Sequence, residues 1–117
     1  MTIEIPFRLP SLNEYINACR TNRFSAAKMK KDIESQLFPY IIRLPMYEKP
    51  VRIEFTWLES NAKRDCDNVS FGKKFILDAM VKFNRLPNDS PKYIKGFTDS
   101  FEYGNRAGVI VSVEEEK

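Results

Sequence analysis

Residues 51–59 read Val51-Arg52-Ile53-Glu54-Phe55-Thr56-Trp57-Leu58-Glu59, with apolar side chains at every second position from Val51 to Trp57. Successive side chains of an extended chain point to opposite faces, so this alternation produces one apolar face and one polar face. The pattern predicts a β-strand over residues 50–59 that buries its apolar face against the rest of the protein.

Three more segments of the chain have the character of strands. Residues 2–8 also alternate, although Pro6 indicates a strand that lies at a sheet edge or ends early. The other two expected strands cover residues 92–103 and 107–114. Glycine and asparagine in the connecting segment 103–108 favour a hairpin between them.

Apolar residues at helical spacing predict two helices. The first begins at Ser25, a suitable N-cap, carries its apolar stripe to Ile41, and is kinked or shortened by Pro39. The second runs from about residue 70 to residue 83. The order β-α-β-α-β-β is typical of an α+β domain with two helices packed on a small mixed β-sheet. The length of 117 residues suits one domain, expected to span residues 1–117.

The composition excludes several kinds of chemistry. The chain has no histidine, which removes Ser-His-Asp catalysis and metal sites built on imidazole. Its two cysteines cannot form a four-thiolate zinc site, and its four glycines form no phosphate-binding loop. No apolar run approaches the roughly 20 residues that span a bilayer, so a soluble, cytoplasmic protein without membrane contact is expected.

The positive charge is concentrated in one segment, although the net charge is only +3. Residues 15–31 include no acidic residue and five basic ones, namely Arg20, Arg23, Lys28, Lys30 and Lys31. A basic face of this kind is expected where a protein contacts a phosphate backbone. A lysine-rich helix face that is simply solvated is the alternative, and charge alone favours it.

Three aspartates are the candidates for chemistry. Asp65 and Asp67 follow the central strand, and they point the same way if their segment is extended. Asp89 lies in the loop after the second helix, and an extended return of about 20 Å would bring it back to them. Three aspartates and water would suit Mg²⁺ or Mn²⁺. The alternative is that Asp67 and Asn68 only cap the helix.

Three blocks of the sequence resemble the RusA family of Holliday-junction resolvases. They are Lys63-Arg64-Asp65-Cys66-Asp67-Asn68, then Lys74-Phe75-Ile76-Leu77-Asp78-Ala79, and finally Asn88-Asp89-Ser90, in the order that the family shows. The opening Leu9-Pro10-Ser11-Leu12-Asn13-Glu14-Tyr15 is also similar to that of the family. The resemblance extends over nearly the whole chain, and it implies a RusA-like fold.

The resemblance implies roles for individual residues. Asp65, Asp67 and Asp89 match the metal-binding catalytic aspartates of the family, and Lys74 matches its essential lysine. About two extra residues precede Lys74, so Lys73 competes for that role, and an ion pair with Asp78 is the structural alternative for Lys74. Expected nucleic-acid contacts are Lys63, Arg64 and Lys73 together with Arg20, Arg23, Lys28, Lys30 and Lys31.

The function implied by the resemblance is that of a Mg²⁺-dependent endodeoxyribonuclease, with Mn²⁺ as a possible substitute, that cleaves four-way DNA junctions in recombination and repair. Paired cuts in opposed strands favour a two-fold homodimer. Such a protein would work in the cytoplasm of a bacterial or phage-infected cell. The alternative is a non-catalytic DNA-binding or phage accessory protein on the same fold.

Overall fold

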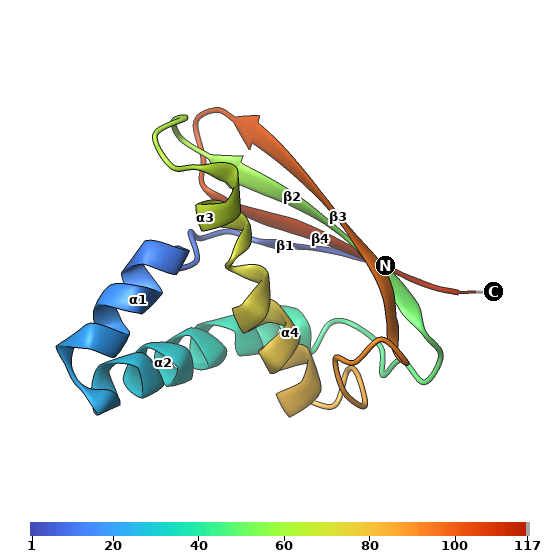
Figure 1. Ribbon diagram of the computed structural model, residues 1–117. Helices are drawn as coiled ribbons and strands as arrows, with labels where there is room; N and C mark the ends of the chain where they lie inside the picture. The colour runs from blue at the N-terminus through green and yellow to red at the C-terminus, as the bar shows by residue number, and fades with distance from the viewer. Residues whose placement is uncertain (117) are drawn as a thin grey trace.

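The computed structural model describes residues 1–116, which fold into a mixed four-stranded sheet with helices on one side (Figure 1). There are three longer helices and one short one. The helices are α1 (Leu12–Thr21), α2 (Arg23–Ile41), α3 (Cys66–Ser70) and α4 (Lys73–Lys82). The strands are β1 (Thr2–Ile5), β2 (Val51–Glu59), β3 (Ile94–Tyr103) and β4 (Gly108–Glu115). The α+β class is confirmed, whereas the expected element order with two helices is wrong.

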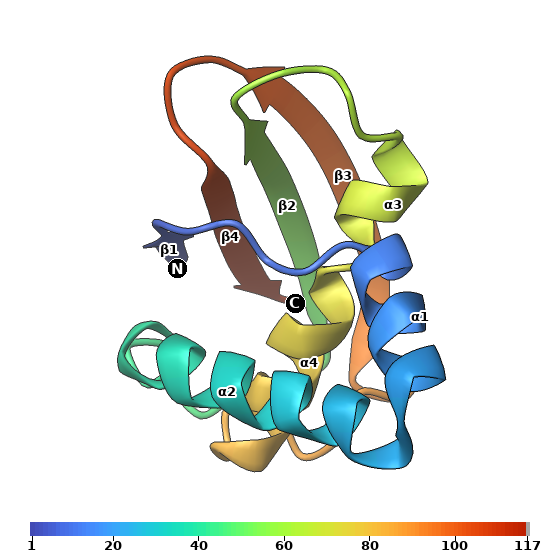
Figure 2. The same ribbon diagram turned by 90° about the vertical axis from the view of Figure 1, so that its left-hand side faces the viewer.

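The strands lie in the order β1-β4-β2-β3, as Figure 2 shows from left to right. The central pair β2 and β4 is antiparallel, and β1 is antiparallel to β4 at one edge. At the other edge β3 runs parallel to β2. A parallel pair needs a long crossover connection, and the segment that contains α3 and α4 supplies it.

The expected hairpin across residues 103–108 is wrong. Strands β3 and β4 lie on opposite sides of β2, so the connection passes the end of β2 instead of closing a hairpin. Turn-forming residues show only that the chain reverses, and long-range pairing decides which strand it joins. Gly108 has a further role, because a Cβ there would lie 2.3 Å from the carbonyl oxygen of Ile5 and its φ is +152°.

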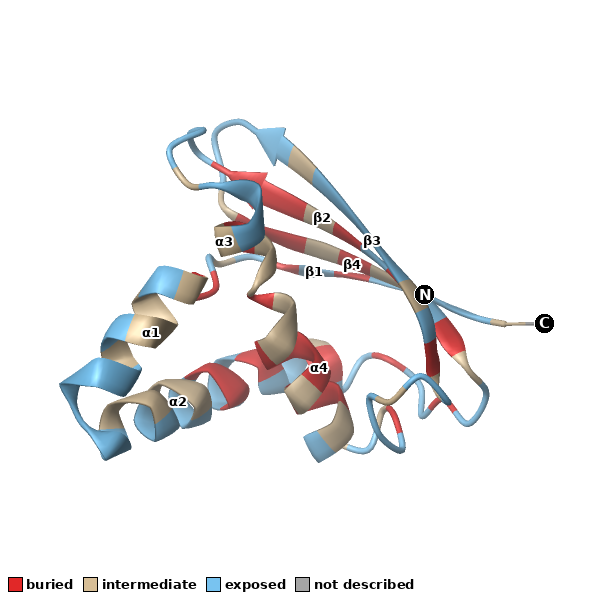
Figure 3. Cartoon of the chain, viewed as in Figure 1, coloured by how far each residue is buried: buried red, intermediate tan, exposed pale blue. Residues whose placement is uncertain are grey.

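The core lies between the helices and one face of the sheet, where the buried residues gather (Figure 3). The expected apolar face of β2 is confirmed, because Ile53, Phe55 and Trp57 are buried beside Val111 of β4. Polar residues of β2 alternate with them on the opposite face. Truncation of a buried phenylalanine such as Phe55 would cost about 3–5 kcal/mol.

Helix α1 was not expected from the pattern of apolar residues, because none of its residues is fully buried. Its start has a local signal nevertheless. The Ser11 hydroxyl accepts a hydrogen bond from the Glu14 N–H, and the Glu14 carboxylate accepts one from the Ser11 N–H. This reciprocal pair is a capping box. Helix α2 then begins at Arg23, two residues before the expected N-cap, because Asn22 caps it.

Helix α2 otherwise follows its sequence pattern. Ile33, Leu37 and Ile41 are buried on one stripe, and Pro39 lies within the last turn without ending the helix earlier.

No helix within residues 1–116 combines the length and apolar character needed to cross a bilayer. Both cysteines are exposed free thiols.

The helix expected from about residue 70 to residue 83 is α4, and a separate short helix that was not expected, α3, precedes it, with Phe71 and Gly72 between the two. The chain comes very close to the sheet at this break. A Cβ at Gly72 would lie 3.1 Å from both the Trp57 ring and the Leu9 Cβ. The glycine therefore lets the α3–α4 connection rest directly on the core, and it places Asp67 and Lys74 on either side of one break.

Candidate active site

Asp65 and Asp67 lie at the beginning of α3, and both are exposed. Asp65 occupies the N-cap position with an extended backbone, yet its side chain makes no capping hydrogen bond. Asp67 accepts one hydrogen bond, at 2.9 Å, from the N–H of the next residue, Asn68. The capping interpretation therefore does not account for Asp65, and it accounts for Asp67 only through this local bond.

Asn68 has a different task. Its Oδ1 accepts a hydrogen bond of 2.9 Å from the N–H of Asn13, in the first turn of α1. This N–H has no partner within the helix, so a side chain from α3 satisfies it. The bond ties α1 to the segment that contains the two aspartates.

Asp67 and Asp89 line the same hollow, of about 410 Å³, at the face of α3 and α4. Lys74 lines it too, so three of the four expected catalytic residues meet there although they come from separate segments. Asp65 does not line this hollow. Within residues 1–116 no three acidic or cysteine side chains come close enough together to form a preformed metal-binding group.

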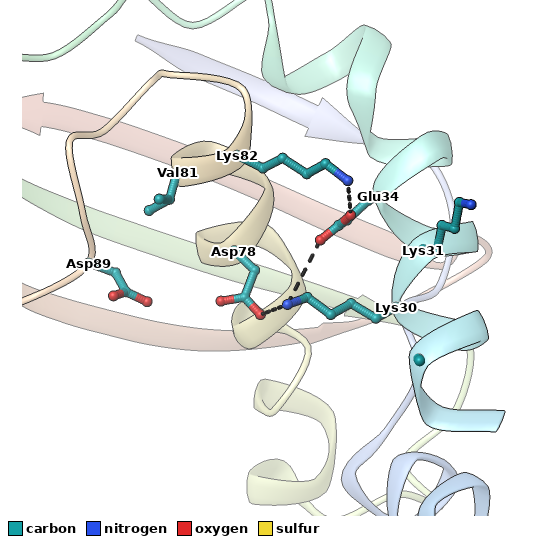
Figure 4. A pocket seen from close by; sticks show the side chains of 8 residues that line it. Lys30, Lys31, Glu34, Asp78, Val81, Lys82 and Asp89 are labelled. Atoms are coloured by element: carbon teal, nitrogen blue, oxygen red, sulfur yellow. Dashed lines mark hydrogen bonds and ion pairs between the residues drawn. The ribbon is translucent and has the colours of Figure 1, made fainter. Parts of the chain in front are cut away.

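A second hollow, of about 570 Å³, lies between α2 and α4 (Figure 4). Asp78 and Asp89 line both hollows, which places these two carboxylates where the hollows adjoin. The far side of the second hollow is formed by Lys30 and Lys31 of α2. The basic helix predicted from the sequence therefore faces the candidate catalytic groups.

Ion pairs join α2 to α4 across this hollow (Figure 4). The Oδ2 atom of Asp78 lies 3.3 Å from Lys74 Nζ and 3.4 Å from Lys30 Nζ. Glu34, which is buried, pairs with Lys82 at 2.7 Å and with Lys30 at 4.0 Å. The sequence pattern identified Asp78 only as a partner for Lys74. Its contact with α2 had no signal in the sequence.

The two candidate lysines differ in their surroundings. Lys73 Nζ lies 2.6 Å from Asp99 Oδ2 and sits over the rings of Phe55 and Phe97. Asp99 also accepts a hydrogen bond of 2.8 Å from Trp57 Nε1. Lys73 is therefore held against the sheet. Both lysines line the first hollow. Lys74 shares Asp78 with a second lysine and keeps 43% of its side chain exposed, against 22% for Lys73, so it is the lysine better placed to meet a ligand there.

Arg64, which the sequence predicts to contact nucleic acid, forms an ion pair within the protein. Its Nε and Nη2 atoms donate to the two carboxylate oxygens of Glu59 at 2.8 Å each. Glu14 lies 3.6 Å away, and only 18% of the Arg64 side chain is exposed. A guanidinium engaged in this way positions the segment before Asp65 and has little surface left for a phosphate.

The same cluster affects the ionisation of Glu14. Burial of the carboxyl group favours its neutral form, but the hydrogen bond and charge of Arg8, with hydrogen bonds from Ser11, outweigh burial. Together they hold the pKa of Glu14 below its ordinary value. Glu14 is therefore charged at neutral pH and available to pair with Arg64.

The other expected cations are accessible. Arg20, Arg23, Lys28, Lys31 and Lys63 are exposed. Lys28 pairs with Asp32 at 2.8 Å, and this hydrogen bond and charge raise the pKa of Lys28. Within residues 1–116 the other four form no ion pair. They are free to meet phosphate groups.

No family model matches the chain, and no curated protein matches it. The resemblance to the RusA family is therefore a hypothesis that depends on the residue blocks of the sequence.

Proposed function

We propose that the protein is a magnesium-dependent endonuclease that cleaves branched DNA, above all four-way junctions. The observation that supports this function best is the gathering of Asp67, Asp89 and Lys74, from three separate segments, around one hollow. Two basic residues of α2, Lys30 and Lys31, line the hollow that adjoins it. Carboxylates next to a cationic helix suit a reaction at a phosphate group.

The donor set fits magnesium, which proteins usually bind through one or two carboxylates together with water. Asp67 and Asp89 would hold the ion, and Asp65, whose side chain makes no capping bond, is the candidate for a further ligand. Bound magnesium polarises a phosphate oxygen and lowers the pKa of water. Manganese prefers the same oxygen ligands and is the expected substitute.

Lys74 would offset negative charge on the phosphate that reacts. Its ammonium group is directed by Asp78, which Lys30 also contacts. A DNA phosphate that binds Lys30 would break the Lys30–Asp78 ion pair, and Asp78 would then pair with Lys74 alone. A phosphate bound in the first hollow would instead compete with Asp78 for the ammonium group of Lys74. Asp78 and Lys30 therefore position the lysine and do not themselves react.

Two observations favour the second candidate, a non-catalytic DNA-binding or phage accessory protein. Asp65 lies outside the hollow, and Lys74 is already paired with Asp78. Such a protein would use the same basic helix to bind DNA without cutting it.

The deciding experiment incubates the purified protein with an end-labelled four-way junction and with a linear duplex of the same arm sequence. Cleavage of the junction with magnesium, and its loss with a chelator, is expected. Manganese should restore cleavage. Binding of the junction without strand scission in either metal would contradict the endonuclease proposal and favour the non-catalytic protein.

A second prediction concerns how the affinity for the junction depends on salt concentration. Replacing Lys28, Lys30 and Lys31 by glutamine should flatten the plot of log affinity for the junction against log salt concentration. Each lost phosphate contact lowers the slope by about 1, because fewer counterions are released on binding. Fluorescence anisotropy of labelled junction, measured with chelator present, gives the slope.

The matched control for that experiment replaces three basic residues outside α2, namely Lys49, Lys95 and Arg106, by glutamine. It changes the net charge by the same amount. A slope that falls equally in both triple variants would show that net charge, and not α2, determines binding.

We further propose that two chains act as a two-fold homodimer, because junction resolution needs paired cuts and each chain offers one such hollow. Of the apolar residues after α2, Leu44 and Tyr47 are buried, but Ile42 and Met46 remain 39% and 66% exposed. Analytical ultracentrifugation at micromolar concentration should give the mass of two chains. A monomer that makes both cuts in one binding event would contradict the dimer.

A further inference from the structure

Phe24 is an exposed aromatic residue at the beginning of α2. Its side chain is 66% exposed, more than that of any other phenylalanine within residues 1–116. It follows the turn between α1 and α2, which projects from the end of the helices farthest from the sheet (Figure 1). A large apolar side chain in this position contributes nothing to the core, so a role in binding has to be considered.

The backbone at this position is fixed. The Asn22 side chain accepts hydrogen bonds from the N–H groups of Phe24 and Ser25, at 2.9 and 3.0 Å. Both bonds belong to the N-cap of a helix of 19 residues. The aromatic ring is thus presented from a rigid helix end, which reduces the entropy lost when the ring binds a partner.

The surroundings of the ring are cationic. The guanidinium group of Arg23 lies 4.8 Å from the centre of the Phe24 ring. Arg20 is in the last turn of α1, and Lys28 follows one turn later on α2. Lys28 pairs with Asp32, whereas Arg20 and Arg23 form no ion pair within residues 1–116. An apolar ring beside such cations complements a nucleobase flanked by phosphates. An apolar protein pocket would leave these charges without partners.

Phe24 is also aligned with the second hollow. Ala27 and Lys31 follow it at i+3 and i+7, on the same face of α2, and both line that hollow. Seven residues of helix cover about 10 Å, or about three base steps of DNA. A base stacked on Phe24 would therefore lie a few nucleotides from Asp78 and Asp89.

We propose that Phe24 is a stacking wedge, which inserts at the branch point of a DNA junction and stacks on a base there. This inference rests on the proposed function. Bases at a branch point are less firmly paired and stacked than those of a duplex, so the wedge opens them at lower cost. Phe24 thereby contributes preference for branched DNA, which phosphate contacts alone do not provide.

The test compares Phe24→Ala with wild-type protein for binding to a four-way junction and to a linear duplex, in chelator so that no strand is cut. Junction affinity should fall about tenfold or more, the usual loss for one base–aromatic stack, while duplex affinity changes little. A junction with 2-aminopurine at the branch point should become brighter with wild-type protein, because unstacking relieves quenching. The alanine variant should lose that signal.

Two matched variants complete the experiment. Phe24→Trp should keep both the affinity and the fluorescence signal. Phe38→Ala removes another exposed aromatic side chain of α2, 45% exposed and next to Phe83, and should behave as wild type. Circular dichroism should show the same helix content in all four proteins, because Asn22 caps α2 through the backbone of residue 24.

The outcomes separate the wedge from the proposed function. Wild-type preference for the junction that persists in Phe24→Ala, with the fluorescence signal intact, would overturn the wedge alone. No preference for the junction in the wild type would overturn both. Loss of self-association in Phe24→Ala, without loss of junction affinity, would identify a second copy of the chain as the partner of Phe24 and would also overturn the wedge.

Discussion

Replacing Asp67 by asparagine is expected to lower the rate of junction cleavage by about 100-fold or more, while junction binding stays equal or becomes tighter. Changes to groups that only support a metal ligand cost about 10–100-fold, so loss of a ligand should cost at least as much. Binding tightens because one negative charge facing the phosphates is removed. Single-turnover cleavage and gel-shift titration measure the two effects.

The Asp67→Asn substitution should change the charge at this position without changing the local fold. Asparagine keeps the Oδ1 acceptor that Asp67 offers to the Asn68 N–H, so the fold at the start of α3 is retained. A purely capping role predicts at most about 1 kcal/mol of lost stability and unchanged turnover. Near-normal cleavage by Asp67→Asn would therefore contradict the catalytic assignment.

Two further variants make this experiment sharper. Asp65→Asn tests the additional ligand, and a similar loss of cleavage would show that Asp65 acts with Asp67 despite its place outside the hollow. Glu48→Gln removes one exposed negative charge far from α3 and should cleave as wild type. Thermal unfolding of each variant shows whether the fold is unchanged.

Replacing Lys74 by alanine is the other large expected effect. The turnover number should fall by about 10²–10³-fold, the usual loss for one group that stabilises developing charge. Junction affinity should change only a few-fold, because one of many cations is lost. Turnover and affinity are measured on the same labelled junction, with magnesium and with chelator.

Lys73→Ala is the comparison variant. Lys73 pairs with Asp99 at 2.6 Å, so its loss leaves the Asp99 carboxylate, 26% exposed, with Trp57 as its only partner within residues 1–116. Unfolding free energy should fall by about 2 kcal/mol, junction affinity should weaken, and turnover should stay near that of wild type. If the two turnover effects are exchanged, Lys73 is the catalytic lysine and the proposed alignment of the second block is wrong.

Local periodicity predicted much of the architecture. The alternation of residues 51–59 indicated both the strand and its buried face, and β2 forms over nearly those residues. The apolar stripe that ends at Ile41 likewise indicated α2 and its buried side. These predictions were accurate because side-chain spacing and burial are linked within a few residues of chain.

The candidate site was predictable in part. The reach of the loop after α4 allowed Asp89 to return, and Asp89 does line the hollow that Asp67 lines. The sequence could not exclude Arg64 as a phosphate contact, because nothing local shows that Glu59 is buried and occupies its guanidinium group. The sequence assigned the lysine role to Lys74 with Lys73 as the competitor, but nothing local in it shows that Lys73 pairs with Asp99.

The amino-acid sequence by itself determined which faces of β2 and α2 are apolar and which residue types are available for chemistry. Tertiary structure alone decided that β3 pairs with β2 and not with β4, that Lys73 meets Asp99, and that Asp78 joins α2 to α4. The physical reason is the range of the interactions. Periodicity is encoded between neighbours, whereas strand pairing and charge pairing join residues that are tens of positions apart, and their partners are fixed only when the whole core packs.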